Sequence, residues 1–173
     1  LNTTYGRLLY RTIKAGVQNK IKAILWYQGE SNCTISWANY LNNFSILRSS
    51  WQENFPGFKK IYLFQVRMGC GSTYTYQSQL REVQRRIGEI FSDVEMMSTM
   101  GVWGHDGCHY NYLGYYETAL NIFRLIARDF YNSTDTLNID PPNIISAVYT
   151  SPLKNKVKLI FSPGCNLVIP QDT

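Results

Sequence analysis

Two side chains that can carry acid–base chemistry lie three residues apart in a glycine-rich stretch, residues 100–111. Asp106 precedes His109, and His105 is the other histidine of the chain. At this spacing a carboxylate can accept a hydrogen bond from the near imidazole nitrogen, which fixes the tautomer and leaves the far nitrogen free to act as a general base. Asp106 and His109 are therefore predicted to be two members of an acyl-transfer triad. The alternative is a structural loop in which His109 caps the helix that follows.

The same stretch offers a second kind of chemistry, a metal site built from His105, Asp106, Cys108 and His109. Two histidines four residues apart resemble a pair of zinc ligands, but such pairs usually lie on one face of a helix. Glycines interrupt this run, so a helix is not expected there. The prediction is therefore a site without a metal or another cofactor, and a zinc site is kept as an alternative.

The elements that must position these residues follow from the hydrophobic pattern. Runs of β-branched and aromatic residues predict strands, and apolar positions three and four apart predict helices. The expected strands span residues 21–27, 60–66 and 94–100, and the expected helices span residues 3–15, 36–55, 76–91 and 112–131. Ser36 is the expected N-cap of the second helix. The last helix should turn one apolar stripe toward the core, formed by Leu113, Tyr116, Leu120, Phe123, Ala127 and Phe130.

Alternation of strands and helices predicts a parallel sheet with helices on its faces. In such folds, sites form beyond the carboxyl ends of the strands. Two loops should meet there, residues 28–32 after the first strand and residues 106–109 after the third. Cys70 and Cys108 each follow a predicted strand at this same end, so that either a disulfide between them or two free thiols fits the pattern.

The pattern changes after residue 135. Asp140-Pro141-Pro142 indicates a boundary, and short strands are expected at residues 144–149, 156–161 and 167–169. We therefore predict an α/β domain portion at residues 1–138 and a β-rich extension, or the start of an all-β module, at residues 139–173.

Charge and composition exclude several functions. The chain has 173 residues, with 17 basic and 12 acidic side chains and a net charge of +5. The basic residues are scattered and form no stripe interleaved with exposed aromatics, so nucleic-acid binding is not predicted. No apolar run is long enough to cross a membrane, and no membrane span is expected.

Three motifs resemble those of a known family. Trp26-Tyr27-Gln28-Gly29-Glu30-Ser31 resembles the Trp-x-Gln-Gly-Glu-Ser block of the sialate O-acetylesterase and acetyl xylan esterase branch of the SGNH (GDSL-like) hydrolases. Leu80-Arg81-Glu82-Val83-Gln84 resembles a Leu-Arg-x-x-Gln segment of that branch, and Asp106-x-x-His109 resembles its closing block. The resemblance covers residues 1–131 in matching order, and the β-rich tail is similar to material that follows the catalytic domain in sialate O-acetylesterases.

This resemblance implies a flavodoxin-like three-layer α/β/α fold and hydrolysis of acetyl esters on carbohydrates, without a metal. His109 would deprotonate a serine and later protonate the departing sugar oxygen, while Asp106 orients the imidazole. Gln28, Gly29, Glu30 and Ser31 would line the oxyanion and substrate side. In the wider superfamily this block supplies an asparagine where the present chain has Ser31. The substrate class further implies an extracytoplasmic setting (secreted, periplasmic or lysosomal).

Other residues of these motifs have structural interpretations. For Glu30 we favour a buried carboxylate that accepts hydrogen bonds from backbone amides and holds the loop, rather than direct catalysis. Arg81 and Gln84 are expected to support the fold, and the alternative is that they lie on an exposed helix face.

The chain departs from the family pattern at the nucleophile. The family carries its catalytic serine in a Gly-Gln-Ser or Gly-Asp-Ser turn after its first strand, and this chain has no such turn. Ser31 lies in another block and Ser72 follows another strand. We therefore expect an incomplete domain that lacks its N-terminal part and exposes one edge of the parallel sheet. Alone it should be inactive or poorly folded, and it would need that part from the same precursor or from a separate chain. The alternative is a non-catalytic member that binds acetylated glycans.

Overall fold

The computed structural model describes residues 2–69 and 75–165. Their secondary structure follows the predicted order, with short 3₁₀ turns at Gln18–Lys20 and Trp37–Asn39. The helices are α1 (Thr4–Lys14), α2 (Asn32–Ile35), α3 (Tyr40–Asn54), α4 (Gln77–Ile90) and α5 (Tyr112–Tyr131). The strands are β1 (Ala23–Tyr27), β2 (Lys60–Phe64), β3 (Val94–Met97), β4 (Ile144–Tyr149) and β5 (Val157–Phe161).

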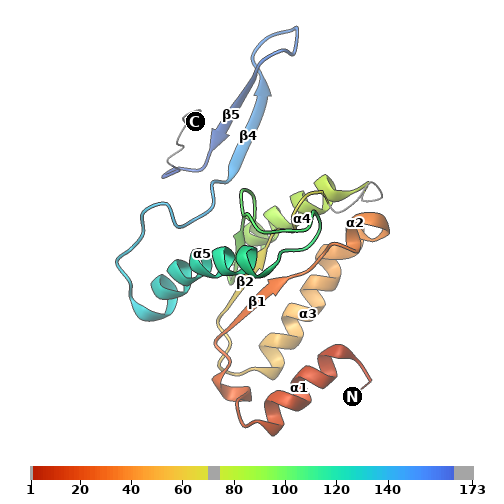
Figure 1. The fold of residues 1–173 in the computed structure, drawn as a ribbon, viewed down its shortest axis with the longest axis vertical. Coiled ribbons are helices and arrows are strands. Elements are labelled where there is room, and N and C mark those ends of the chain that lie inside the picture. Colours follow the sequence, from red (N-terminus) through yellow and green to blue (C-terminus); the bar gives the residue numbers. More distant parts are fainter. Residues whose placement is uncertain (1, 70–74, 166–173) are drawn as a thin grey trace. The chain divides into compact units, whose positions relative to one another are not determined.

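Contacts divide the chain into two units, residues 1–120 and residues 121–173, which are described separately. In the first unit, β1, β2 and β3 form a parallel sheet in that order, so the predicted parallel α/β arrangement is confirmed (Figure 1). Ala23 lies opposite Lys60, and Ile61 lies opposite Val94. The predicted division at residue 138 stays a prediction.

The core of the first unit forms between β2 and the helices α3 and α4. Ile61 and Leu63 on β2 are fully buried, as are Leu80 and Ile87 on α4. A central parallel strand is covered on both faces, and this explains why β2 is a continuous apolar run rather than an alternating one. The aromatic side of the core comes from α3 and the residue that ends it, and includes Phe44, Trp51 and Phe55.

The predicted helix at residues 36–55 is interrupted. The chain forms α2, a 3₁₀ turn and then α3, and the Ser36 side chain caps neither helix. Its Oγ instead accepts a hydrogen bond from Asn32 Nδ2 at 2.8 Å. The prediction of Ser36 as an N-cap was therefore wrong, because a local side-chain bond competes for this hydroxyl.

The predicted core-facing stripe on α5 was also wrong. Leu113, Tyr116, Leu120 and Phe123 are between 52% and 66% exposed. The buried positions of α5 are Gly114, Ile122 and Leu125, which lie on another side of the helix. The helix therefore carries an apolar face that no described residue covers.

Both outer strands of the sheet lack a second neighbour among the described residues, because β1 and β3 each pair only with β2. Leu25, at the centre of β1, is 54% exposed. Unpaired parallel edges with apolar side chains are uncommon in stable proteins. The expected absence of an N-terminal part stays a prediction.

The second unit contains the end of α5 and an antiparallel pair of strands, β4 and β5, with an irregularity between Ile144 and Ser146. Arg124 binds Asp135 through two hydrogen bonds, and Arg128 binds Asp140. The first two strands predicted in the tail are confirmed, and residues 167–169 lie outside the described ranges.

A buried glutamine from α4 ties the ends of two strands together. Gln84 is 0% exposed, and its Nε2 donates to the Gln28 carbonyl at 3.0 Å, just after β1. Its Oε1 accepts from the Val66 amide at 2.9 Å, just after β2. Both polar ends of the side chain are therefore satisfied without water, and the predicted fold-supporting role of Gln84 is confirmed.

Arg81, one turn earlier on α4, makes a similar link. Its guanidinium donates to the Val66 carbonyl and to Gln65 Oε1, while Gln65 Nε2 donates to the Arg81 carbonyl. Burial lowers the pKa of Arg81 because the charged form is desolvated. Arg81 and Gln84 are thus not exposed surface residues, and together they hold the chain just after β2.

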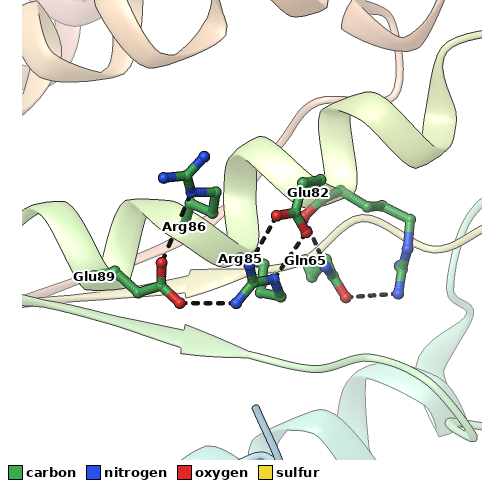
Figure 2. Close-up of polar contacts among 6 residues, drawn as sticks. Gln65, Glu82, Arg85, Arg86 and Glu89 are labelled. Carbon is green, nitrogen blue, oxygen red and sulfur yellow. Dashed lines mark hydrogen bonds and ion pairs between the residues drawn. The ribbon is translucent and has the colours of Figure 1, made fainter. Parts of the chain in front are cut away.

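The outer side of α4 carries an ion-pair cluster. Figure 2 shows Arg85 between Glu82 and Glu89, with hydrogen bonds of 2.7 Å and 2.8 Å. Hydrogen bonds from Arg85 lower the pKa of Glu82. Pairs of this kind, three and four residues apart and partly exposed, each contribute only about 0.3–0.5 kcal/mol, so the cluster supports the helix rather than a site.

Replacing Gln84 by leucine should destabilise the protein strongly. Gln84→Leu leaves the Val66 amide and the Gln28 carbonyl buried without one of their partners, at a cost of about 2–4 kcal/mol in the free energy of unfolding. Urea unfolding followed by circular dichroism measures the loss. Gln79→Leu, at an exposed position of the same helix, is the matched control and should change stability by less than about 0.5 kcal/mol. Equal effects of the two substitutions would contradict the role given to Gln84.

Candidate functional site

Aromatic contacts join the ends of the strands where the site was predicted. Tyr27 ends β1, and its ring centroid lies 5.9 Å from that of Tyr110, the residue after His109. The Tyr27 hydroxyl accepts from the backbone amide of Arg67, in the loop after β2, at 3.5 Å. The chain segments at the carboxyl ends of β1, β2 and β3 therefore meet at the same end of the sheet, as predicted for a parallel α/β fold.

Asp106 is held by the backbone of its own loop. Its Oδ1 accepts from the amides of Cys108 at 2.8 Å and His109 at 2.7 Å. These two hydrogen bonds lower the pKa of Asp106, and the nearby His109 adds a smaller effect in the same direction. The carboxylate is thus kept ionised and fixed relative to the histidine.

The second oxygen of Asp106 faces the imidazole. Asp106 Oδ2 lies 3.8 Å from His109 Nδ1, and both side chains are exposed. That distance is longer than a hydrogen bond, so the predicted bond between carboxylate and imidazole is not formed in this structure. The carboxylate nevertheless lies on the Nδ1 side of the imidazole, and the catalytic role of the two residues stays a prediction.

The start of α5 is capped by Asn111 and not by His109. Asn111 Oδ1 accepts from the Leu113 amide at 3.0 Å, and the Asn111 amide donates to the Gly104 carbonyl at 2.8 Å. Gly104 has a positive φ of 77°, and a Cβ at this position would lie 2.6 Å from the Gly114 nitrogen. His109 is therefore free of the structural role that was its alternative. Asparagine before an apolar helix is a known capping signal, which the sequence interpretation missed.

The loop after β1 is shaped by close packing. Gly29 has a φ of 144°, and a Cβ there would approach Gln84, Leu80 and Val66 at 3.1 Å. Gln28 Nε2 donates to Asn32 Oδ1 at 2.7 Å, and Ser31 is exposed at the start of α2. The loop therefore has a defined shape in which only glycine fits at position 29.

Glu30 differs from its predicted structural role. It is half-buried, and its carboxylate makes no hydrogen bond with any described residue. The interpretation of Glu30 as a buried carboxylate bonded to backbone amides was wrong. Its charge acts on neighbours instead: burial raises the pKa of Cys33 to about 11 and raises that of Tyr27, and Glu30 adds to both effects.

A cavity lies beside the end of β1. Its volume is about 200 Å³. It is lined by Trp26, Gln28, Asn32, Tyr40, Asn43, Phe44 and Leu47. The Tyr40 hydroxyl donates to the Gln28 carbonyl at 3.0 Å, so this wall is tied to the loop that begins at Gln28. Amide groups and aromatic rings together form a surface suited to a polar ligand with apolar faces.

The predicted site residues are not all connected by hydrogen bonds or ion pairs in this structure. Among described residues, no hydrogen bond or ion pair links residues 28–31 with Asp106 or His109, and no serine hydroxyl bonds to His109. Cys108 Sγ lies 3.7 Å from His109 Nε2. Ser72 and Cys70 lie outside the described residues, so the Cys70–Cys108 pairing stays a prediction.

Neither a metal-binding group nor a membrane-spanning helix is found among the described residues. Within residues 2–69 and 75–165, no group of three or more His, Cys, Asp or Glu side chains is arranged to hold a metal ion, so the zinc alternative has no geometric basis. None of the helices described for this chain has the length and apolar character that a membrane span requires.

The architecture and the comparison agree on a class of protein. A parallel α/β unit with helices packed on its sheet fits the flavodoxin-like SGNH hydrolase fold. Residues 2–125, well over half of the chain, match the model of the family described as carbohydrate esterase, sialic acid-specific acetylesterase. The chain belongs to this family. No curated protein and no solved structure matches it significantly.

The lowered pKa of Asp106 predicts a pH-dependent stability. Backbone hydrogen bonds stabilise the ionised carboxylate of Asp106 in the folded chain. Its contribution to the free energy of unfolding is therefore complete above the ordinary pKa of 3.8 and is lost as the pH falls through the lower pKa of the folded state. The stability difference between the wild type and Asp106→Asn should therefore shrink in acid. Urea unfolding between pH 7 and 2.5 measures it, with the exposed Glu53→Gln on α3 as control. A difference that grows in acid would contradict this prediction.

Proposed function

We propose that this chain is the part of a carbohydrate O-acetylesterase that supplies the general base, and that a separate segment supplies the nucleophilic serine. The observation that carries the proposal is the Asp106–His109 loop, held by backbone hydrogen bonds in a chain of the acetylesterase family. The activity in general follows from the family. The serine mechanism and the second segment are our inference.

The reaction begins with the histidine. His109 Nε2 takes the proton of the serine hydroxyl as its oxygen attacks the acetyl carbonyl. Asp106 keeps Nδ1 protonated and stabilises the imidazolium that results. Collapse of the tetrahedral intermediate breaks the bond to the sugar oxygen, which takes the proton from His109. Water then repeats the sequence on the acetyl-serine and releases acetate.

In this proposal the loop after β1 stabilises the oxyanion of that intermediate. The backbone amides of Gly29 and Glu30 donate to no described acceptor, and Gln28 uses one of its two side-chain N–H groups for Asn32. Unengaged donors on a rigid loop are what an oxyanion needs, and one such donor contributes about 3–4 kcal/mol to transition-state stabilisation. Ser31, which stands where the superfamily has asparagine, is exposed and lines the substrate side in this proposal.

The uncovered apolar surfaces support a missing segment. Leu25 on the open edge of β1 and the Leu113–Tyr116–Leu120 face of α5 are each about half exposed or more. Surfaces of this kind mark interaction sites in soluble proteins. A parallel strand added beside β1 would bury Leu25. The turn after this strand would then lie at the carboxyl end of the sheet, as His109 does.

A second candidate function has one observation in its favour. Because no described serine bonds to His109, the chain is also compatible with a member that binds O-acetylated glycans without hydrolysing them. Turnover separates the two functions, since only the esterase releases acetate.

Activity should depend on both the missing segment and His109. The isolated 173 residues should release no acetate from an O-acetylated sialic acid, and the full gene product should be active. His109→Ala should lower kcat/KM by at least about 10³-fold, and Asp106→Asn by up to about 10⁴-fold. Acetate release is the measurement, with Glu53→Gln as control.

Two results would overturn the proposal. Turnover by the isolated chain that is abolished by His109→Ala would refute the separate nucleophile segment. A full gene product that binds the acetylated sugar but releases no acetate would establish the binding function instead.

The open edge gives an independent test of the missing segment. Leu25→Lys should reduce aggregation of the isolated chain, because a charge on an edge strand discourages pairing. In the full gene product the same substitution should destabilise the fold by about 2 kcal/mol or more, since the lysine would be buried there. Light scattering and thermal unfolding measure the two effects. Ile46→Lys, at a 61% exposed position of α3, should leave the stability of the full product nearly unchanged. A Leu25→Lys product as stable as Ile46→Lys would contradict the proposal.

A further inference from the structure

A second cavity lies between the loops after β2 and β3, with a volume of about 380 Å³. Its walls are Arg67, Met68, Thr99, Met100, Gly101, Val102, Trp103 and His105. The wall that follows β3 leads directly into Asp106, so the cavity adjoins the catalytic loop. Its volume is in the range of small-molecule sites.

Arg67 is the positive group of this cavity. Its guanidinium donates to the carbonyls of Met68 and Gly107, and its second terminal nitrogen lies 2.9 Å from His105 Nε2. No carboxylate of the described residues lies within ion-pair distance of Arg67, and none lines the cavity. The arginine therefore faces the cavity without a counter-ion, and its Nε and one N–H of the second terminal nitrogen have no described acceptor.

The imidazole of His105 faces two hydrogen-bond donors, the guanidinium of Arg67 and the amide of Gly107. The Gly107 amide points at His105 Nδ1 at 3.2 Å, while Arg67 points at Nε2. A neutral imidazole has only one acceptor nitrogen, and a protonated one has none, so the ring cannot satisfy both donors. A bound anionic oxygen would accept from the guanidinium and remove the conflict, in a charge-assisted hydrogen bond.

The mouth of the cavity is apolar. Trp103 is 80% exposed and Met100 is 62% exposed, although both line it. An aromatic ring of this kind packs well against the C–H face of a pyranose, next to the carboxylate that the arginine binds.

We propose that Arg67, together with His105, binds the carboxylate of an acidic sugar, and that Trp103 packs against the sugar ring. This inference rests on the proposed function and deepens it, because it makes Arg67 the residue that selects acidic over neutral acetylated sugars. The description of the family already names sialic acid, and the new element is the assignment of Arg67 as the residue that binds its carboxylate.

Calorimetric titration of the full gene product tests the proposal with two probes that differ only in charge. N-acetylneuraminic acid has no O-acetyl group to be hydrolysed, and its methyl ester lacks the negative charge. The acid should bind at least about tenfold more tightly than the ester, the effect expected of one or two charge-assisted hydrogen bonds. Arg67→Gln should bring the ratio of the two affinities close to one.

The ratio keeps the test informative even if Arg67→Gln disturbs the loop, because a distorted loop weakens both probes alike. Trp103→Ala is the matched variant and should weaken acid and ester by similar factors, with their ratio preserved. Equal binding of acid and ester by the wild type, a preference retained in Arg67→Gln, or inorganic phosphate binding as tightly as the sugar acid would each overturn the proposal. An inactive product that shows the preference refutes the esterase alone, and an active one without it refutes this inference alone.

Discussion

The first unit depends on the buried amide of Gln84. A primary amide carries both donors and an acceptor, so one side chain can bind a carbonyl after β1 and an amide after β2 at the same time. Such a group is costly to bury unless both ends are satisfied, and this requirement fixes the spacing of the two loops. Gly29 completes the arrangement, since its positive φ disfavours other residues and a Cβ there would lie only 3.1 Å from Gln84 Nε2. The Gln-Gly pair of the first motif and the glutamine of the second are thus parts of one interaction.

The sequence was sufficient to predict the layout of this unit because the layout depends on local periodicity. Strand and helix patterns alternate, and parallel strands place their exit loops at one edge. The burial of α5 was not predictable in the same way. Its apolar stripe is real, but whether Leu113 and Tyr116 are covered depends on which other chain segments are present. The interruption before α3 likewise depends on one local hydrogen bond, Asn32 to Ser36, that competes with the helix.

In the site, too, local sequence pattern predicted some features and not others. Types and spacing predicted that Asp106 and His109 act together, which stays a prediction, but they did not predict which way the carboxylate faces. Two backbone amides bind one of its oxygens and leave the other 3.8 Å from the imidazole. The spacing of residues does not show whether the carboxylate of Asp106 will accept hydrogen bonds from backbone amides or from the imidazole of His109. Glu30 failed as a prediction for a related reason, because the described backbone offers it no amide and it acts through its charge instead.

The groups that stay unsatisfied indicate what each surface binds. Leu25 and the exposed face of α5 lack apolar neighbours, and apolar surface is covered best by more protein. Arg67 and His105 have neighbours but lack an acceptor for their donors, a need that further apolar protein cannot meet and an anion can. The two deficits lie on different elements, the apolar one on β1 and α5 and the polar one in the loops after β2 and β3. These two deficits are the reason for proposing both a second protein segment and an acidic ligand, because neither partner could remove the two deficits alone.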